Sequence, residues 1–407
     1  MIRNNSTRIL MIGTYPIINP RHGGQKRVKA IYDLYKRAHI GDVKYASVIV
    51  EKYYQIHGRN DIPISESLSN KIDKSPFLTD LLCGKAIYED KKVREKFIKL
   101  IHKFKPTIIE IEQVYGYLGL KRLLDDIGYQ GLLINSSQNI ETLMKRDIYK
   151  LQNLDLRTQS KTLKMIQNAE TKLAQASVLN VAVSKSDAIY MKKHYKAKHV
   201  IVAQNGMYQL KSKKRYIRKW QKYFANHQVE HIILFVGSGH LPNMTGFFDI
   251  LGKNVSFIPR NTRLVVVGGV SDLINNNLKQ DSAEDICLTL RIELLGQRSE
   301  DDLMALINIA DTIILPITQG GGSNLKTAEA LLSLKPIVAT KYAFRGYEEY
   351  SNLPGVYITD SSQVFCDKIL QAIKSDTPKL YTSRYSAVKA VLWENTLSTL
   401  LQEIKKL

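Results

Sequence analysis

The sequence is poor in cysteine and contains no long apolar run. Its 407 residues include three cysteines, Cys83, Cys287 and Cys366, whose spacing matches no metal site. No run of 18 apolar residues is present, so the sequence predicts no membrane-spanning helix. The first residues lack the apolar core and the small-residue cleavage site of a secretory signal, and a signal peptide is not expected. These absences indicate a protein of the reducing cytoplasm.

Acidic residues are the minority among the charged side chains. The sequence has 59 Lys and Arg against 38 Asp and Glu, which gives a formal net charge of +21. Such a charge favours an anionic partner, which is nucleic acid, an acidic membrane surface or a phosphorylated substrate. The length exceeds that of a single core and suits two domains.

Apolar runs alternate with segments of helical periodicity along the whole chain. The expected strands of the first half lie at 8–16, 43–50, 107–114, 131–137, 177–184 and 199–206, and those of the second half at 231–239, 263–269, 289–296, 312–317, 336–340 and 356–359. This alternation predicts the α/β class with two doubly wound Rossmann-like domains facing a cleft. The domains are expected at 1–206 and 207–384. A final helix at 385–407 is expected to cross back to the first domain, and one long polar helix is expected at 141–176.

A glycine-rich loop follows the expected strand 312–317. Glycines at 320–322 let a ligand approach the backbone, and the helix expected from about Ser323 offers free N–H groups and a partial positive charge to an anion. With Ser323 as N-cap, a capping box requires Glu or Gln where Lys326 stands. A cation at this helix end predicts that Lys326 faces an anion such as a diphosphate, with Glu329 on the same helix face. The alternative is that the glycines only form a turn.

Several segments resemble one enzyme family. Residues 310–340, ADTIILPITQGGGSNLKTAEALLSLKPIVAT, resemble the glycine loop, lysine and glutamate of the retaining GT-B glycosyltransferases known as glycosyl transferases group 1. Further similar segments are HGGQKRV (22–28), NSSQNIE (135–141), VAVSKSD (181–187), VAQNG (202–206) and LFVGSGHLPNMTGFFDIL (234–251). The resemblance implies an acceptor-side domain at 1–206 and a donor-binding domain at 207–384.

The resemblance also implies a set of donor-binding residues. Glu329 matches the second glutamate of the family's E-x7-E motif and is expected at the nucleotide ribose, whereas Gly321 replaces the first. Ser238 stands where many members have a phosphate-binding arginine. The full set is Gly23, Gly24, Ser238, Asn243, Gln297, Arg298, Gly320, Gly321, Gly322, Ser323, Asn324, Lys326 and Glu329, of which Lys326 and Gly23–Gly24 are expected at the diphosphate and Gln297 and Arg298 beside the base.

The acceptor side is implied by the first half of the chain. Its expected residues are His22, Tyr115, Gln138 and Glu141, with Tyr115 as a ring that stacks on a sugar. Gln138 occupies the histidine position of the family's HNxE motif, where it can form hydrogen bonds but cannot titrate. The expected catalytic residues are Lys326, Glu329 and Gln138.

The implied reaction is sugar transfer from a nucleoside-diphosphate sugar, UDP- or GDP-linked, to a glycan or glycolipid acceptor with retention of configuration. A hexosyltransferase role in cell-surface polysaccharide synthesis is expected, without metal or cofactor, because Asp125-Asp126 and Asp301-Asp302 fall on helices expected to be solvated. The basic helices at 91–105 and 215–224 are candidate contacts with an acidic membrane. The alternatives are a solvated face for 91–105 and a structural role for 215–224, and the structural role is the favoured one. The expected location is the cytoplasm, with peripheral attachment at the inner face of the cell membrane as a candidate.

Two other functions are compatible with parts of the pattern. A nucleotide-sugar 2-epimerase shares the fold, but it requires acidic and histidine residues that the motifs lack. A basic nucleic-acid-binding protein suits the charge, but it requires basic residues interleaved with exposed aromatics on one module. In this chain the basic residues are spread over both halves, so no nucleic-acid partner is expected.

Overall fold

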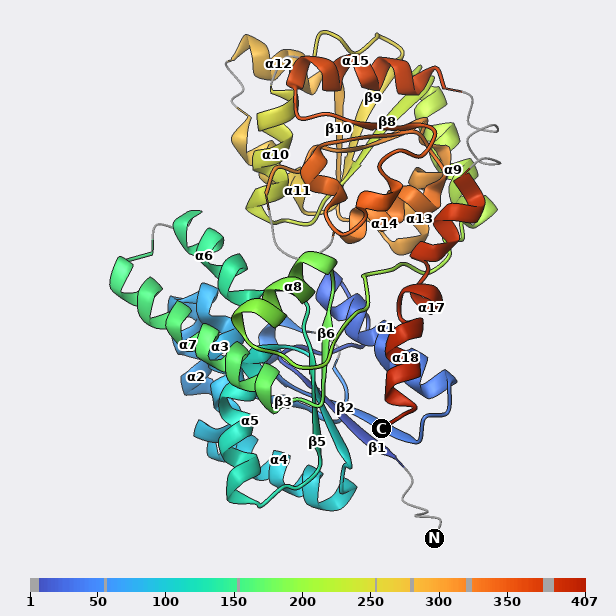
Figure 1. Ribbon diagram of the computed structural model, residues 1–407. Coiled ribbons are helices and arrows are strands. Elements are labelled where there is room, and N and C mark those ends of the chain that lie inside the picture. Colours follow the sequence, from blue (N-terminus) through green and yellow to red (C-terminus); the bar gives the residue numbers. More distant parts are fainter. Residues whose placement is uncertain are drawn as a thin grey trace. The chain divides into compact units, whose positions relative to one another are not determined.

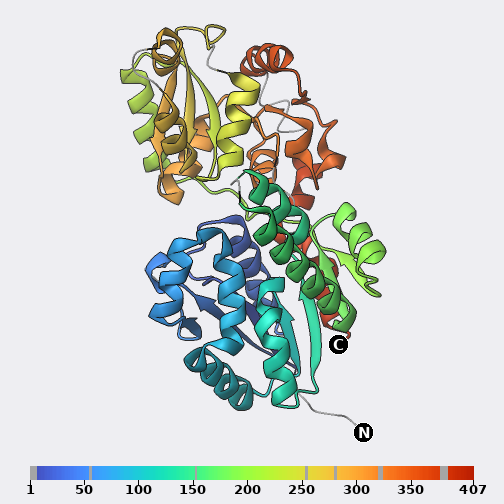
Figure 2. The ribbon, with the colours of Figure 1, turned by 90° about the vertical axis from the view of Figure 1, so that its left-hand side faces the viewer.

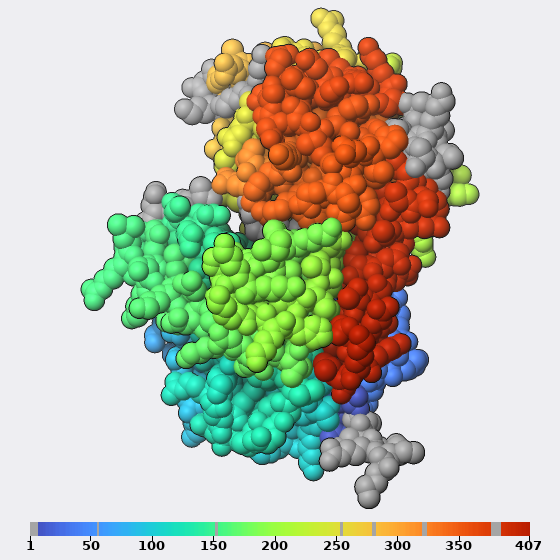
Figure 3. All heavy atoms as spheres, viewed as in Figure 1, coloured from blue at the N-terminus to red at the C-terminus, as the bar shows by residue number. Residues whose placement is uncertain are grey.

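The computed structural model describes residues 7–54, 57–151, 154–252, 255–278, 282–319, 324–375 and 384–407. The chain forms two compact units (Figure 1). Unit 1 comprises Met1–Gln204 and Leu397–Leu407, and unit 2 comprises Asn205–Thr396. The last residues therefore belong with the first unit, where α18 (Ser398–Ile404) packs against edge strand β7 (Val200–Val202). Figure 3 shows the red C-terminal residues beside green residues of this unit.

Unit 1 is built on a parallel sheet with the order β3-β2-β1-β4-β5-β6-β7. Its strands are β1 (Arg8–Gly13), β2 (Asp42–Ile49), β3 (Asp61–Pro63), β4 (Ile108–Ile111), β5 (Leu132–Ser136), β6 (Leu179–Ala182) and β7 (Val200–Val202). Its helices are α1 (Gly23–Arg37), α2 (Glu66–Lys74), α3 (Thr79–Glu89), α4 (Lys91–Phe104), α5 (Val114–Asp126), α6 (Glu141–Leu151), α7 (Leu156–Ala176), α8 (Lys185–His194) and α18, with short 3-10 turns at Glu51–Tyr53 and Pro76–Leu78. Figure 2 shows these helices on both sides of the sheet.

Unit 2 repeats the design with the parallel order β10-β9-β8-β11-β12-β13. Its strands are β8 (His231–Val236), β9 (Thr262–Val267), β10 (Ile292–Gly296), β11 (Thr312–Leu315), β12 (Ile337–Ala339) and β13 (Val356–Ile358). Its helices are α9 (Lys214–Asn226), α10 (Leu241–Leu251), α11 (Val270–Asn277), α12 (Ala283–Thr289), α13 (Glu300–Ile309), α14 (Leu325–Ser333), α15 (Ser362–Ile373) and α17 (Trp393–Thr396), with 3-10 turns at Lys341–Phe344, Glu348–Tyr350 and Lys389–Val391.

Both faces of each sheet are buried, which explains why the strands are apolar without alternation. In β8, Leu234 belongs to the core on one face of the sheet, and its neighbours Ile233 and Phe235 belong to the core on the other. Successive strand side chains point to opposite faces, so a strand covered by helices on both sides needs apolar residues at every position. The predicted doubly wound α/β class is confirmed.

The strand orders define one switch point in each sheet. In unit 1 the chain runs outward from β1 to β2 and β3 and then returns to place β4 on the other side of β1. In unit 2 the same reversal separates β8 from β11. Ligands of open α/β sheets bind in the crevice outside the carboxyl ends of the strands at such a point. The residues that follow β1, β4, β8 and β11 are therefore the first place to look for a site.

Three predicted elements have different bounds in the structure. The single helix expected at 141–176 is divided into α6 and α7, because Asp155 caps a new helix by accepting a hydrogen bond from the Thr158 N–H. The helix expected at 385–407 is a series of short segments. The strand expected at 107–114 is β4 alone, and α5 begins at Val114.

The basic helix α9 has no free apolar face. Trp220 and Phe224 are buried in the core of unit 2, with Ile217 packed against them, so insertion of this helix into a bilayer requires unfolding of that core. Over the described ranges, every helix is too short or too polar to cross a bilayer.

Helices α3 and α5 meet through glycines. A Cβ at Gly84 of α3 is placed 1.9 Å from the carbonyl oxygen of Tyr115, and a Cβ at Gly119 of α5 is placed 2.6 Å from the carbonyl oxygen of Gly84. The obstructing atoms are backbone and cannot swing away. This close approach fixes the beginnings of α3 and α5 relative to one another.

We expect the Gly84→Ala variant to lose about 2 kcal/mol or more of unfolding free energy, because overpacking against backbone forces the helices apart. Gly116→Ala on α5 is the matched control, since a Cβ there has its nearest neighbours at 3.8 to 4.0 Å, an ordinary contact. Urea unfolding followed by circular dichroism measures both. Equal midpoints for the two variants would contradict this account of the α3–α5 contact.

Candidate functional site

Three of the predicted donor-binding residues meet at the switch point of unit 2. Lys326 Nζ donates to Asn243 Oδ1 at 2.6 Å. The amide nitrogen of Asn243 donates in turn to the Ser238 carbonyl oxygen at 2.7 Å and to Ser238 Oγ at 3.2 Å. Ser238 follows β8, Asn243 lies on α10 and Lys326 lies on α14. The predicted residues Gly320, Gly321, Gly322 and Ser323 lie outside the described residues.

Close packing of α10 makes this meeting possible. A Cβ at Gly246 is placed 2.2 Å from the carbonyl oxygen of Pro316, directly after β11. Only glycine lets α10 approach the end of β11 this closely. The approach brings Asn243, one turn earlier on α10, within reach of Lys326 on the helix that follows β11.

The N-cap of α14 differs from the prediction by one residue. Asn324, itself one of the predicted donor-binding residues, is the N-cap, and its Oδ1 accepts a hydrogen bond from the Lys326 N–H at 3.3 Å. The expectation of Ser323 as N-cap is wrong, because an asparagine carboxamide supplies the same acceptor one position later. Lys326 still lies in the first turn, where the helix dipole disfavours a cation.

Burial weakens the hold of Lys326 on its proton. Loss of hydration lowers the pKa of Lys326 to about 8, and the Glu329 carboxylate one turn away opposes that shift. Glu329 itself is buried. Within the part of the chain that the structure describes, the Lys326 ammonium has Asn243 as hydrogen-bond partner and forms no ion pair. Burial and the charge of Lys326 also lower the pKa of His240, which the sequence did not single out.

The two residues expected beside the base follow another strand of the unit 2 sheet. Gln297 and Arg298 follow edge strand β10 and line an open groove of about 780 Å³ with Lys222 and Tyr223 of α9. Among the residues that the structure describes, no hydrogen bond or ion pair joins Gln297 or Arg298 to Ser238, Asn243 or Lys326. Their assignment to the donor site stays a prediction.

In unit 1, Gly23 and Gly24 are the first residues of α1, and the preceding His22 is its N-cap. The His22 ring accepts from the Gln25 N–H and the Gln25 side chain accepts from the His22 N–H, which makes a capping box. The His22 ring also meets the Tyr15 ring edge-on at 4.8 Å. His22 thus stabilises the start of α1. Its contact with the acceptor stays a prediction.

Gln138 lies against this turn. Its Oε1 accepts from the Tyr15 hydroxyl at 2.8 Å and its Nε2 donates to the Glu112 carbonyl at 3.1 Å. A Cβ on Gly24 is placed 2.5 Å from Gln138 Oε1, so the predicted residues Gly24 and Gln138 are neighbours. A small cavity of about 10 Å³ beside Gln138 is lined by polar groups that include Asn139, Glu141 and Glu170.

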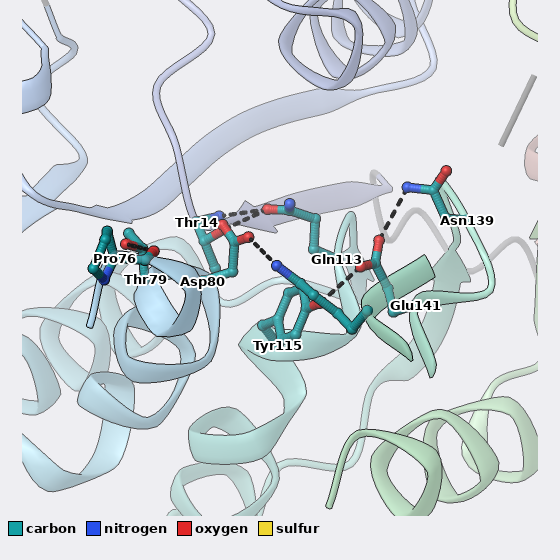
Figure 4. A network of polar contacts seen from close by, with 9 residues as sticks. Thr14, Pro76, Thr79, Asp80, Gln113, Tyr115, Asn139 and Glu141 are labelled. Atoms are coloured by element: carbon teal, nitrogen blue, oxygen red, sulfur yellow. Dashed lines mark hydrogen bonds and ion pairs between the residues drawn. The ribbon is translucent and has the colours of Figure 1, made fainter. Parts of the chain in front are cut away.

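Glu141 is held by two neighbours. The Tyr115 hydroxyl donates to Glu141 Oε2 at 2.7 Å, and Asn139 Nδ2 donates to Oε1 at 3.1 Å (Figure 4). Burial raises the pKa of Glu141, and the charge of Lys145 opposes this. Tyr115 is 1% exposed, so its ring is not available to stack on a sugar, and that expectation is wrong. The tyrosine instead orients a carboxylate.

Sequence reasoning missed four members of this network, which are Thr14, Asp80, Gln113 and Lys145. Lys145 Nζ lies 3.4 Å from Asp80 Oδ2 and 5.4 Å from the centroid of the Tyr115 ring. Thr14, which follows β1, donates to Gln113 Oε1 at 2.5 Å and lies 3.3 Å from Asp80 Oδ1. Lys145 follows Glu141 by four residues on one helix, a spacing that signals a pair. Asp80 lies in a segment without a motif and gave no signal.

Glu170 anchors the helix that carries Glu141 and Lys145. Its carboxylate accepts from the backbone N–H groups of Glu141 and Thr142 at the start of α6, and from the Tyr195 hydroxyl. A carboxylate at a helix N-terminus complements the helix dipole. Burial raises the pKa of Glu170 to about 7, although hydrogen bonds from Thr142 and Tyr195 oppose the shift.

Unit 1 also contains a buried pair of carboxyl groups. Glu110 and Glu112, on and directly after β4, are both 0% exposed, and Arg27 of α1 is close enough to favour their charged forms. Burial raises the pKa of Glu110 to about 7, while burial and the charge of Glu110 raise the pKa of Glu112. Two carboxylates this close cannot both ionise easily, so the pair retains a proton well above the usual range.

The two Asp-Asp pairs have different surroundings. Asp125 is exposed and pairs with Lys121, as a solvated helix face should. Asp302 is buried and accepts from Lys219 and from the Trp220 indole, so the expectation that it is solvated is wrong. Among the residues that the structure describes, no three His, Cys, Asp or Glu side chains are grouped as metal ligands.

Comparisons with known proteins agree with this architecture. The structure of HepE from Anabaena in complex with UDP and glucose has a TM-score of 0.66 at 13% identity and covers 98% of this chain and 100% of that chain. Sucrose-phosphate synthase from Thermosynechococcus elongatus gives 0.70 at 14% identity with 98% of each chain covered. A glycosyltransferase from Rickettsia africae gives 0.55 at 15% identity, with 99% of this chain and 98% of that chain covered. Comparison of the sequence with curated proteins gives no match.

Two doubly wound units in one chain, each with polar groups at the carboxyl ends of its strands, define the GT-B class of fold that these structures share. Residues 230–375, which form most of unit 2, match the family described as Glycosyl transferases group 1. This part of the chain is therefore similar to that family, and the resemblance predicted from the sequence is confirmed for it.

Proposed function

We propose that this protein is a glycosyltransferase that moves a sugar from a UDP- or GDP-linked donor to a glycan or glycolipid with retention of configuration. The reaction proceeds without a metal, and no cofactor is needed beyond the donor substrate. The protein works in the cytoplasm, at the inner face of the membrane, as a hexosyltransferase of cell-surface polysaccharide synthesis. The family match of unit 2 supports sugar transfer as the class of reaction.

One observation carries the donor side of the proposal. Lys326 is a desolvated cation at a helix N-terminus, with Asn243 as its hydrogen-bond partner and no ion pair among the described residues. Such a group is costly in the free protein, since burial disfavours the charged form. A diphosphate placed there removes that cost. The structure of HepE is a complex with UDP, which supports a nucleotide ligand for this chain.

The same geometry suits the chemical step. As the bond from the sugar to the diphosphate breaks, negative charge develops on the leaving phosphate oxygen. Lys326 Nζ and the N–H groups at the start of α14 are fixed in advance and stabilise that charge without reorganisation. Glu329 accepts hydrogen bonds from the ribose hydroxyls. The acceptor hydroxyl attacks from the face of the leaving group, and the departing phosphate takes its proton, which accounts for retention.

The nucleic-acid alternative lacks support on the basic helix α9. Single-stranded nucleic acid requires exposed rings on which bases stack. Trp220 and Phe224 of α9 are buried. These two rings are therefore not available as a stacking platform.

The first test is a thermal-shift panel of UDP-, GDP-, ADP- and CDP-sugars. We expect one nucleotide class to raise the unfolding midpoint, because a ligand that binds the folded state stabilises it by mass action. Lys326→Ala should abolish that shift. Lys335→Ala is the matched control, because Lys335 lies beyond the other end of α14 and burial lowers its pKa as well.

The outcomes separate the alternatives. A shift that survives Lys326→Ala, or one lost equally in Lys335→Ala, would contradict the diphosphate assignment. Epimerised nucleotide sugar formed without an acceptor would indicate the 2-epimerase alternative. A shift by no nucleotide sugar, with and without added oligosaccharide, would reject donor binding altogether.

Donor affinity should also depend on the protonation of Lys326. Its pKa of about 8 means that the ammonium form prevails below that pH and is lost above it. Calorimetry with the UDP-sugar should therefore give a constant dissociation constant up to about pH 8, and a loss approaching tenfold per unit above it. In Lys326→Arg the guanidinium stays charged, so the affinity, although lower, should remain flat with pH. Parallel pH profiles for the two proteins would refute this role.

Helix α4 is the surface that suits an acidic membrane. Lys92, Lys96 and Lys99 are exposed, whereas Phe97 and Ile101 are buried in the unit 1 core. The helix therefore attracts anionic lipid through charge without inserting, at about 1 kcal/mol for each lysine near the surface.

We expect sedimentation with vesicles that contain phosphatidylserine at low salt, and its loss in the triple variant Lys92→Glu, Lys96→Glu, Lys99→Glu. The matched triple variant Arg215→Glu, Arg218→Glu, Lys222→Glu changes the exposed face of α9 by the same charge and should still sediment. Equal binding to pure phosphatidylcholine vesicles, or retention by the α4 variant, would count against membrane attachment through this helix.

A further inference from the structure

Lys145 is a buried lysine whose charge is already balanced inside unit 1. Its side chain is 11% exposed, and its Nζ lies 3.4 Å from Asp80 Oδ2. The carboxylates of Asp80 and Glu141 raise the pKa of Lys145, although burial acts in the opposite direction. One cation is therefore surrounded by two carboxylates.

The network lies at the switch point of unit 1. Thr14 follows β1, Asp80 is in the first turn of α3, and Tyr115 is in the first turn of α5 after β4. Glu141 and Lys145 come from the first turns of α6, which follows β5. Figure 4 shows Thr14, Asp80, Tyr115 and Glu141 converging from these separate elements.

Part of this network is open to a ligand. The Asp80 side chain is 34% exposed, and Gln138 and Asn139 are partly exposed. A carboxylate can accept about four hydrogen bonds. Among the described residues, Thr14 lies within hydrogen-bond distance of Asp80 Oδ1 and Lys145 within that of Asp80 Oδ2, which is one contact for each oxygen. Acceptor positions are left for hydroxyl donors. The ring of Phe77 is also partly exposed, three residues before Asp80.

We infer that this network, defined by Asp80, Lys145 and Glu141, binds the hydroxyl groups of a neutral carbohydrate acceptor and rejects a phosphorylated one. The inference rests on the proposed function, which gives unit 1 the acceptor. A sugar hydroxyl donates to the free acceptor positions of Asp80, and adjacent hydroxyls engage both of its oxygens. The partly exposed amide of Asn139, which donates to Glu141, adds a neutral polar group to the network.

An anionic group meets the opposite situation. A phosphate that approaches Lys145 also approaches Asp80 and Glu141, and like charges at such distances repel. The phosphate has to displace Asp80 from the ammonium before it gains a cation. Lys145 therefore holds Asp80 in position for a hydroxyl and does not serve as an anion site.

Saturation-transfer NMR without any donor tests the inference directly. The neutral probes are the methyl α-glycosides of glucose, galactose and mannose, and the anionic probe is glucose 6-phosphate. We expect at least one methyl glycoside to bind the wild-type protein, and glucose 6-phosphate to bind at least about tenfold more weakly. Asp80→Asn should weaken glycoside binding about tenfold, and it should improve binding of glucose 6-phosphate because Lys145 then lacks its closest carboxylate.

Asp125→Asn is the matched control. Asp125 also forms a lysine pair in unit 1, with Lys121, but that pair is on the exposed face of α5. Its loss should change neither probe. Unfolding midpoints of the three proteins confirm that each is folded.

Tighter binding of glucose 6-phosphate than of every glycoside would overturn the inference, as would the absence of binding by all three glycosides. Equal behaviour of Asp80→Asn and Asp125→Asn would overturn it as well. The UDP-sugar thermal shift, measured on the same variants, keeps the two proposals separate. A normal shift with no glycoside binding rejects this subsite alone, whereas glycoside binding with no shift for any nucleotide sugar rejects the donor assignment alone.

Discussion

The burial of two lysine ammonium groups at the carboxyl ends of parallel strands is the constraint on which both candidate sites depend. Removing a charge from water is costly unless a partner compensates it. Lys145 has that compensation within unit 1, and its pKa is raised. Lys326 lies beside a neutral amide, and its pKa falls to about 8. The same residue type thus predicts opposite ligands, a neutral one in unit 1 and an anion in unit 2.

Each environment follows from how the neighbouring helices are positioned. In unit 2, Gly246 lets α10 approach the end of β11, and this brings Asn243 to Lys326. In unit 1, the glycine contact between α3 and α5 sets the positions of Asp80 and Tyr115, while Glu170 anchors the start of α6. The close backbone contacts at the glycines determine where the charged side chains of each unit lie. Glycines that form no part of either polar network therefore control the electrostatics of both sites.

The sequence was sufficient for the α/β class, for most of the strands and for the position of Lys326 in the first turn of a helix. Those inferences rest on local signals, namely apolar runs and a cation in the first turn of a helix. The diphosphate contact of Lys326 stays a prediction. The break between α6 and α7 also had a local signal, because Asp155 is a good N-cap, but the polar periodicity on both sides concealed it. The Asp80–Lys145 pair joins residues 65 positions apart, so only the folded sheet brings them together. The burial of Tyr115 was equally unpredictable. The local sequence around a tyrosine after a strand end is the same whether its side chain faces solvent or a carboxylate.

The two lysines also differ in when their charge matters. In the proposed reaction the leaving diphosphate gains further negative charge as the sugar bond breaks. An ammonium whose described hydrogen-bond partner is a neutral amide then stabilises the transition state more than the ground state. Lys145 cannot act in this way, because Asp80 and Glu141 already use its charge. In the proposed acceptor site, Lys145 holds the Asp80 carboxylate in position to accept a hydrogen bond from an acceptor hydroxyl. This contact acts on binding of the ground state. In the proposed reaction, loss of the Lys326 charge therefore weakens donor binding and also lowers the turnover rate, whereas loss of the Asp80 charge lowers acceptor affinity alone. The difference originates in how each unit compensates one buried cation.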